Sequence, residues 1–416
     1  MKEKITSTES ASTVCYEAME VHARSCIQSW LQDLLEAEVT EFLGRGKSQR
    51  CAEVEEVRLG YRNGYGKPRR VALTAGTITV RRPRVRNLAE HFESRVLPLF
   101  KRRSVELGAL LPRLYLHGLS TGDFELALRG LLGEGAPLSA SSMQRLKGLW
   151  QAEYGDWKGA DLSRLELVYW WADGLYVKAG IAERKAALLV IVAATAEGEK
   201  VLLACQAGER ESKESWLSLL RGLKARGLVL PRLTVADGHL GIWSALGELH
   251  PAGDEQRCWN HKIVNVLNQL PKHEQPEAAE RLRAVMYAES RSACERKRDE
   301  FLLRFKKTDA KACATLLRDW ERMVSFFDYP KEHWIHLRTT NIVESPFNAV
   351  RLRTDAARRF KKTENAEAMI WKLMRVAEQS WRKLNAPKLM QKVYEGKSFR
   401  DGIAVKTKIE PTRKAA

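Results

Sequence analysis

Hydrophobic residues change along the chain from helical spacing to strand-like runs, and these changes divide it into regions. From residue 14 to residue 45 apolar positions recur every three or four residues, which predicts one or two amphipathic helices ending at Gly44. Short β-rich runs bracketed by Asn-Gly and Gly-Lys-Pro turns follow in residues 60–87 and predict a small hairpin unit. Helical spacing returns in three short stretches of residues 104–150, a pattern that fits a helix-turn-helix.

From residue 164 the pattern is that of an α/β fold. Three apolar strand-like runs come first: "RLELVYWWADG", "RKAALLVIVAATAEG" and "EKVLLACQAGE". An amphipathic helical stretch, "SKESWLSLLRGLKARGL", and a fourth apolar run, "PRLTVADGHLG", follow. This β-β-β-α-β order is that of the ribonuclease H fold. Residues 262–335 are helical and highly charged, and the polar, basic tail beyond residue 386 is expected to be mobile.

The charge of the chain indicates a polyanion as its partner. Its 416 residues include 70 lysines and arginines against 52 acids, which gives a formal net charge of +18. A surface this basic is typical of nucleic-acid binding, and basicity for solubility alone is the alternative. No apolar run reaches the length of a membrane span, and seven scattered cysteines form no disulfide framework. We therefore expect a cytoplasmic protein without a membrane partner.

Two N-terminal regions hold candidate DNA-binding residues. Arginines run along the predicted hairpin, where a basic ribbon can lie against phosphates; a charged edge ribbon in solvent is the alternative. The third predicted helix opens with "SASSMQRLK" and would offer polar side chains to a DNA groove. The candidates are Arg81, Arg82, Arg84, Arg86, Ser141, Ser142, Gln144 and Arg145.

Two aspartates stand at corresponding places in apolar runs. Asp173 in "YWWADGLY" and Asp237 in "LTVADGHL" are each expected at a strand end, where open α/β sheets expose functional groups. A single Asp-Gly is usually a turn, but two such pairs in a basic protein indicate more. Paired carboxylates repel one another unless a cation lies between them, and oxygen ligands of this kind suit Mg²⁺ or Mn²⁺. Two such ions support phosphodiester chemistry, which requires a third carboxylate.

Glu344, in "TTNIVESPFNAVRLRT", is the candidate for that third carboxylate, with a capping or ion-pairing role as the alternative. Two helix starts compete here: capping by Asn341, or capping by Ser345 with Pro346 as the first helical residue. Proline also steers Ser345 away from helical angles. The polar and basic residues around the glutamate form a candidate DNA-binding stripe, with a solvated helix face as the alternative. They are Asn341, Asn348, Arg351, Arg353, Arg358, Arg359, Lys361 and Lys362.

Several blocks of the sequence resemble the bacterial Mutator-type insertion-sequence transposases. They run in order over residues 25–385 and include "GYRNGYGKPRRVALTAGTITVRRPRVR", "WWADGLYVK", "LTVADGHLGIWSAL", "RCWNHKIVNVLNQLPK" and "YPKEHWIHLRTTNIVESPFNAVRLRT". The resemblance implies a ribonuclease H-like core with a helical insertion, and Asp-Asp-Glu DNA cleavage and strand transfer with two Mg²⁺ or Mn²⁺ ions. Position by position, Asp173, Asp237 and Glu344 match the family acids. Terminal inverted repeats and target DNA are the implied partners, with a homodimer or larger assembly and copy-out through a circular intermediate.

Four further residues are assigned a structural or DNA-positioning role. Cys258 and His261 match the family's Cys-x-x-His element and look like half of a zinc site, for which two more ligands would be needed. Trp320 and Trp334 in the insertion are candidates for stacking on an extruded base, with a core role as the alternative. A DNA-binding protein derived from a transposase and a nuclease without joining activity are the competing functions.

The predicted organisation has five parts. It comprises N-terminal helices plus a basic β-hairpin unit over residues 1–95, a helix-turn-helix-like DNA-binding domain over 96–160, a ribonuclease H-like catalytic core over 161–262 and 336–385, a helical insertion domain over 263–335, and a basic mobile tail over 386–416.

Overall fold

The computed structural model divides into two compact units, Met1–Leu146 and Lys147–Ala416. The residues described are 18–50, 58–88, 92–98, 101–102, 104–116, 132, 140–178, 185–208, 210–348, 350–351 and 363–405. None of the helices in these ranges is both long enough and apolar enough to cross a bilayer.

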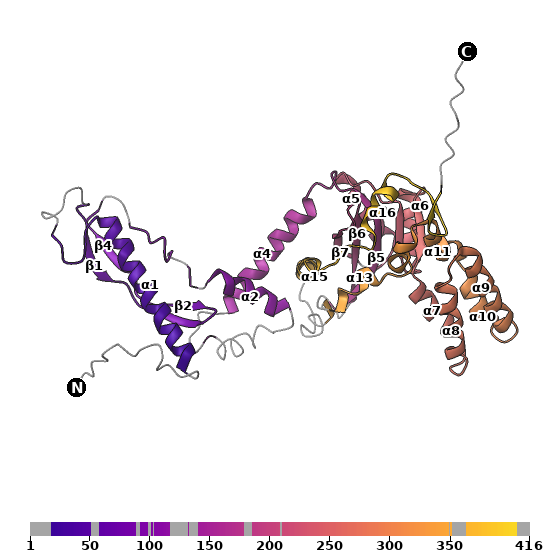
Figure 1. Cartoon of the computed structure of the whole chain (residues 1–416), viewed down its shortest axis with the longest axis horizontal. Helices are drawn as coiled ribbons and strands as arrows, with labels where there is room; N and C mark the ends of the chain where they lie inside the picture. The colour runs from indigo at the N-terminus through magenta and orange to yellow at the C-terminus, as the bar shows by residue number, and fades with distance from the viewer. Residues whose placement is uncertain are drawn as a thin grey trace, which may run out of the picture. The chain divides into compact units, whose positions relative to one another are not determined.

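The N-terminal unit is built on one long helix and a β-hairpin (Figure 1). Helix α1 ends at Gly44, which takes a φ of 69° in the left-handed region, where a glycine carries no Cβ penalty. The helix end predicted from the sequence is therefore confirmed. The elements of this unit are α1 (Met19–Leu43), β1 (Tyr61–Tyr65), β2 (Arg69–Leu73), β3 (Gly76–Val80), β4 (Pro83–Arg86) and α2 (Val105–Leu116).

Strands β1 to β4 form two successive halves of one hairpin. β1 pairs antiparallel with β4 and β2 with β3, and the Gly66 N–H donates to the Arg82 carbonyl at 2.8 Å between the halves. Gln32 of α1 fastens the helix to the returning strand, because its side-chain amide bonds both the N–H and the carbonyl of Arg81 at 2.9 Å. A small core seals the contact: Leu35, Val71, Ile78, Val80 and Leu97.

The predicted helix-turn-helix is described only in part. Its first helix corresponds to α2 and its last to α4 (Ala140–Gly159), which runs across the boundary between the two units. Its middle helix falls on residues 117–131 and 133–139, which lie outside the described residues.

A five-stranded mixed sheet in the order β7-β6-β5-β8-β9 forms the centre of the second unit (Figure 1). β7, β6 and β5 are mutually antiparallel, whereas β8 and β9 continue the sheet in parallel with β5. The chain thus has the predicted β-β-β-α-β order, with β9 as an unpredicted fifth strand. The bounds are β5 (Leu167–Lys178), β6 (Lys185–Thr195), β7 (Lys200–Gly208), α5 (Lys213–Ala225), β8 (Leu233–Ala236), α6 (Leu240–Leu249) and β9 (Asp254–Arg257).

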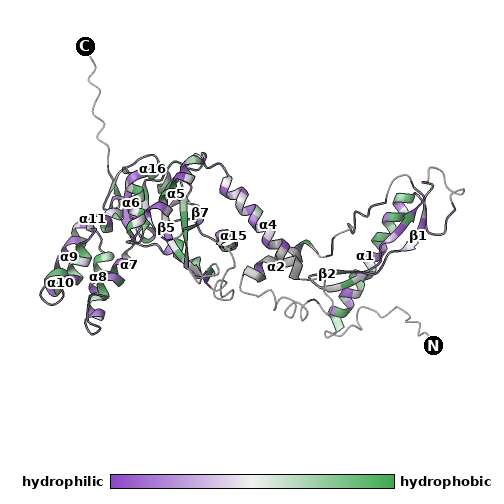
Figure 2. Ribbon diagram, turned by 180° about the vertical axis from the view of Figure 1, so that it is seen from behind, coloured by the Kyte–Doolittle hydropathy of each residue, from purple (hydrophilic) through white to green (hydrophobic). Residues whose placement is uncertain are grey.

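Both faces of the sheet are covered, which explains why its strands are almost continuously hydrophobic (Figure 2). Helices α5 and α6 cover one face, and Trp170 of β5 packs into the core that they form. The neighbouring residues of β5 point to the opposite face. There the Tyr169 hydroxyl contacts His333 Nδ1 at 2.9 Å, and the Trp171 indole donates to the His336 carbonyl at 2.8 Å.

A helical region follows β9, as the sequence predicts for residues 262–335. It ends at a single helical turn that carries the glutamate of interest. Its elements are α7 (Trp259–Leu267), α8 (Gln275–Met286), α9 (Arg291–Phe305), α10 (Ala310–Leu317), α11 (Trp320–Val324), the 3₁₀ turns η4 (Ser325–Asp328) and η5 (Lys331–His333), α12 (Trp334–Leu337) and α13 (Asn341–Glu344).

The C-terminal segment corrects one prediction. Residues expected to be a mobile tail form α16 (Pro387–Tyr394) and a short hairpin of β10 (Phe399–Arg400) and β11 (Ile403–Ala404), after α15 (Thr363–Glu378). Met390 and Val393 on one face of α16 are buried. The polar composition of this segment did not indicate the short amphipathic helix. The tail is folded at least as far as residue 405.

Candidate active site

Asp173 and Asp237 occupy neighbouring positions on two parallel strands. Ala172 of β5 pairs with Ala236 of β8, so the aspartates that follow them lie side by side, roughly 5 Å apart in backbone terms. Asp237 directly follows the end of β8, as predicted. Asp173 does not end its strand, because β5 continues to Lys178 in register with β6. That part of the prediction was wrong: the Asp-Gly at 173–174 is strand rather than turn.

Short hydrogen bonds hold both aspartates in place. The Gly174 N–H donates to Asp173 Oδ1 at 2.8 Å, and the His239 N–H donates to Asp237 Oδ1 at the same distance. The Trp243 indole of α6 donates to the Asp237 carbonyl at 2.9 Å. The aspartates are therefore held by the sheet and by the start of α6, and their positions are set before any ligand binds.

Glu344, the last residue of α13, lies near the two aspartates. Burial is the largest cause that raises the pKa of Asp173 to about 7. The negative charge of Glu344 is the next largest, and the charge of Asp237 adds to it. Like charges raise a carboxyl pKa only when they are close. The three acids chosen from the sequence are thus close enough to act on one another electrostatically, and a cation would relieve their repulsion.

This strain has a testable effect on stability without metal. Asp173 holds its proton up to about pH 7 in the folded state but loses it near pH 4 when unfolded. The contribution of Asp173 to the free energy of unfolding is therefore fully present below pH 4 and is lost as the pH rises through 7. In EDTA we expect Asp173→Asn to be more stable than the wild type at pH 8, by about 2 to 4 kcal/mol. The difference should shrink towards pH 4.

Thermal unfolding in EDTA across this pH range measures the difference. The exposed Asp156→Asn is the matched control and should show no such trend. A constant difference between wild type and Asp173→Asn at all pH values would contradict the raised pKa.

The start and the end of the helical insertion are joined at its base, which explains how Glu344 returns to the aspartates. The Trp259 N–H donates to the Arg338 carbonyl at 2.9 Å, and the Asn260 amide donates to the Asn341 side chain at 3.1 Å. The buried Cys258 sulfur accepts from the N–H of Thr340 at 3.4 Å. The length of the insertion therefore does not affect where Glu344 lies.

Thr340 connects these hydrogen bonds at the base of the insertion to the glutamate. It is fully buried, its hydroxyl lies 3.2 Å from the Cys258 sulfur, and the same hydroxyl donates to the Glu344 carboxylate. His261 approaches from the other side, with Nδ1 3.9 Å from Glu344 Oε1. A hydrogen bond with Cys258 and the charges of Glu344 and Asp237 raise the pKa of His261 to about 9. The Cys-x-x-His element thus contacts the third acid directly.

The described residues contain one group of three potential metal donors whose ligand atoms all lie within 4.8 Å: Cys258, His261 and Glu344. A thiolate and an imidazole would suit zinc rather than Mg²⁺. Three features argue against a zinc site: Cys258 already accepts a hydrogen bond from Thr340, His261 is favoured in its protonated form, and a structural site needs a fourth ligand. Carboxylate oxygens such as those of Asp173, Asp237 and Glu344 suit Mg²⁺ or Mn²⁺ better than zinc.

Glu211 is a fourth acid at this site, and sequence reasoning missed it. It lies just before α5 and is only 6% exposed. The Asp237 charge adds to the burial that raises its pKa. Its surroundings in the sequence, "GERESKES", show only a charged loop, so the signal that reveals it is structural.

The helix around Glu344 differs from both predicted starts. Thr340 rather than Asn341 or Ser345 precedes α13, and Ser345 keeps helical angles (φ −55°, ψ −46°) despite the following proline. The chain then turns, and the Val350 N–H donates to the Pro346 carbonyl in a new helical turn. Helix α13 therefore ends at Glu344, before Asn348 and Arg351.

The other predicted DNA-contacting residues near Glu344 are placed in part. Asn341, Asn348 and Arg351 are exposed. Of the N-terminal candidates, Arg145 is exposed on α4, and the side chains of Ser141, Ser142 and Gln144 on the same helix lie outside the described part. The stripe residues that lie outside the described residues are Arg353, Arg358, Arg359, Lys361 and Lys362.

Trp320 and Trp334 belong to the core. Trp334 is 2% exposed, and its indole donates to the Tyr329 carbonyl at 2.8 Å. Trp320 is 7% exposed and packs edge-to-face on Trp259, with Arg298 over its ring. Neither ring offers an open face to a base, which supports their structural role.

In the N-terminal unit, arginines line a hollow of about 970 Å³ along the hairpin. Arg82 Nε is buried without a hydrogen-bond partner, and the charges of Arg82 and Arg102 add to the burial that lowers the pKa of Arg69. Glu93 is the single acid among the described residues that line it. The basic residues of this hollow, called here the hairpin groove, are Lys67, Arg69, Arg82, Arg84, Arg86 and Arg102. Arg81, also predicted, is exposed beside it.

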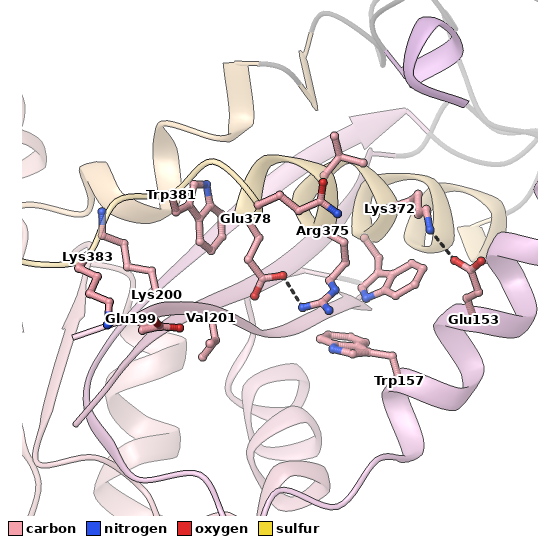
Figure 3. Close-up of a pocket in the computed structure, with 13 residues that line it drawn as sticks. Glu153, Trp157, Glu199, Lys200, Val201, Lys372, Arg375, Glu378, Trp381 and Lys383 are labelled. Carbon is pink, nitrogen blue, oxygen red and sulfur yellow. Dashed lines mark hydrogen bonds and ion pairs between the residues drawn. The ribbon is translucent and has the colours of Figure 1, made fainter. Parts of the chain in front are cut away.

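A second hollow, of about 750 Å³, lies between α4, β7 and α15 (Figure 3). It combines tryptophans with basic residues, as a nucleic-acid groove does. Three of its basic residues are already paired, however: Lys372 with Glu153 at 2.5 Å, Arg375 with Glu378, and Lys383 with Glu199 at 3.0 Å. Trp157 and Trp371 also pack on each other, with ring centroids 5.8 Å apart. This hollow is therefore a poorer phosphate site than the hairpin groove.

Comparison with known proteins gives a consistent result. The sequence model of "Transposase, Mutator family" matches residues 1–384. The transposase for insertion sequence element IS6120 of Mycolicibacterium smegmatis is 43% identical over 71% of this chain and 92% of its own length. The transposase for IST2 of Acidithiobacillus ferrooxidans is 38% identical over 67% of this chain and 94% of its own length.

Solved structures are similar only at a low level. The catalytic core of HTLV-2 integrase, solved in complex with magnesium, is 16% identical and covers 31% of this chain and 92% of its own, with a TM-score of 0.18. The Drosophila P element transposase in its strand transfer complex is 12% identical and covers 68% and 83%, with a TM-score of 0.28. Scores this low say nothing of function.

Proposed function

The chain belongs to the Mutator family of transposases, and we propose that it cuts and joins DNA at the ends of an insertion sequence through Asp173, Asp237 and Glu344. The observation that carries this proposal is the pairing of β5 with β8, which sets two aspartates side by side where a third acid raises the pKa of one of them. The core that holds them is proposed to be ribonuclease H-like.

The donor set fits Mg²⁺ or Mn²⁺, because it consists of carboxylate oxygens that repel one another. Asp173, Asp237 and Glu344 would hold two such ions. When bound, these ions activate an attacking oxygen and stabilise a leaving oxygen in phosphodiester chemistry. The chain's own part is to fix the acids: the sheet holds the aspartates, and Thr340 orients the glutamate.

The hairpin groove is proposed to bind the terminal inverted repeats. Its guanidinium groups, among them Arg82 with an unpaired Nε, suit DNA phosphates, and the polar residues around Glu344 would contact the DNA that is cut. Because two ends must be brought together, we propose a homodimer or larger assembly. Copy-out through a circular intermediate is the proposed route, and amplification across the joined ends of the element in cells tests it.

Labelled end DNA incubated with the protein and Mg²⁺ tests the reaction. We expect cleavage that frees a 3′-hydroxyl, followed by joining to another strand. Binding without cleavage would indicate a DNA-binding derivative, and cleavage without joining would indicate a nuclease. Either result would overturn the proposal.

Cys258 and His261 are proposed to position Glu344 rather than to bind zinc. Cys258→Ala removes the acceptor of the buried Thr340 N–H, which costs about 1–3 kcal/mol and frees the glutamate to move. Cleavage should fall roughly 10- to 100-fold. Cys258→Ser keeps an acceptor and should retain most activity, with end binding unchanged in both variants. Equal loss in Ala and Ser, together with protein-bound zinc, would favour the zinc site instead.

A further inference from the structure

Two glycines make space for a buried glutamate beside the aspartates. A Cβ on Gly174, the residue after Asp173, would lie 2.3 Å from the Glu211 carboxyl carbon and from its Oε1. A Cβ on Gly241, in the first turn of α6, would lie 2.1 Å from the Glu211 carbonyl oxygen. Side chains at either position would displace Glu211, so both β5 and α6 are shaped around it.

The surroundings of Glu211 do not suit a structural ion pair. Within the described part of the chain, the charges that act on it come from Asp237, His239 and His261 rather than from a lysine or arginine. Its carboxylate is hydrogen-bonded to the half-exposed Tyr176 hydroxyl. A buried carboxylate next to another carboxylate is costly unless a cation compensates it. In a core designed only for stability, a neutral side chain would serve better here.

We propose that Glu211 is a fourth carboxylate ligand of the metal site, from the segment that joins β7 to α5. The proposal rests on the proposed function, because it adds a ligand to the same site. It gives Gly174 a role within a continuous strand, because a side chain at this position would collide with the Glu211 carboxyl group.

Titration calorimetry with MnCl₂ on the full-length protein tests this without any measurement of activity. Glu211→Gln keeps the volume and an oxygen that can accept from Tyr176 but removes the charge. We expect it to weaken Mn²⁺ binding roughly 10-fold or more and to reduce the increase in Tm that Mn²⁺ produces. Glu214→Gln, an exposed change three residues away, is the control and should match the wild type.

The outcomes separate this proposal from the one that it rests on. If Asp173→Asn weakens Mn²⁺ binding while Glu211→Gln binds as the wild type does, Glu211 is no ligand and the triad stands. If Asp173→Asn and Asp237→Asn both bind as the wild type does, the metal site itself is wrong.

A second variant guards against misfolding of Glu211→Gln. Gly174→Ala changes none of the acidic residues, but its Cβ would displace the end of the flexible Glu211 side chain. It should weaken Mn²⁺ binding in the same direction. Unchanged Mn²⁺ affinity in a folded Gly174→Ala protein, judged by circular dichroism, would overturn the proposal.

Discussion

Replacing any one of the three acids, through Asp173→Asn, Asp237→Asn or Glu344→Gln, should abolish cleavage and strand transfer. Each change keeps the size of the side chain but removes a negative charge from the site that would hold the ions. Because stabilisation of the transition state depends on those ions, we expect a loss of at least roughly 1000-fold, which corresponds to about 4 kcal/mol. Gel assays with labelled element ends and Mg²⁺ measure the loss.

Binding to the ends should survive in all three variants, because the residues proposed to bind them lie in the N-terminal unit. Asp156→Asn and Glu214→Gln change exposed acids away from the site and should stay active. A fully active variant at one of the three positions would remove that residue from the proposed site. Loss of binding along with cleavage would point instead to damage of the fold.

A double substitution in the hairpin groove, Arg84→Ala with Arg86→Ala, should weaken binding to element ends roughly 100-fold at physiological salt. Both side chains are exposed, so the fold should persist. If each arginine neutralises one phosphate, the slope of log affinity against log salt should become shallower by about 2. Fluorescence anisotropy at several salt concentrations measures both quantities.

The control for this prediction removes two positive charges elsewhere. Lys388→Ala with Lys392→Ala, on the exposed side of α16, changes the net charge equally and should leave the slope unchanged. Equal losses in the two double variants would mean that overall charge, rather than the groove, governs binding.

The order of the strands could be predicted because a sheet covered on both faces needs long apolar runs, and β5 to β8 have them. Strand β9 could not, because its sequence is "DEQR". The buried Gln256 satisfies its side chain through the Met323 carbonyl and the Phe326 N–H, and Arg257 pairs with Asp319 at 2.7 Å. All of these partners lie more than 60 residues away, so local sequence gives no sign of the strand.

The candidate acids could be identified from the sequence, but their proximity in the folded chain could not be predicted from it. Spacing alone cannot show that Glu344 returns to Asp173, because the return depends on contacts between Cys258 and Thr340 across the insertion. The sequence around Glu211 has no distinguishing pattern. In the structure, Glu211 is identified by its side chain, which fills the position that a Cβ on Gly174 would need. Side chains that act through distant partners are the part of a site that local patterns miss.

The position of the insertion between Asp237 and Glu344 also sets an order in time. A ribosome synthesises both aspartates and then the whole insertion before it reaches the third acid. The hydrogen bond between Thr340 and Cys258 can form only once Thr340 has been synthesised. On the proposed function, a nascent or truncated chain that ends before Thr340 would have the hairpin groove but lack Glu344, so it would occupy the ends of the element without cutting them.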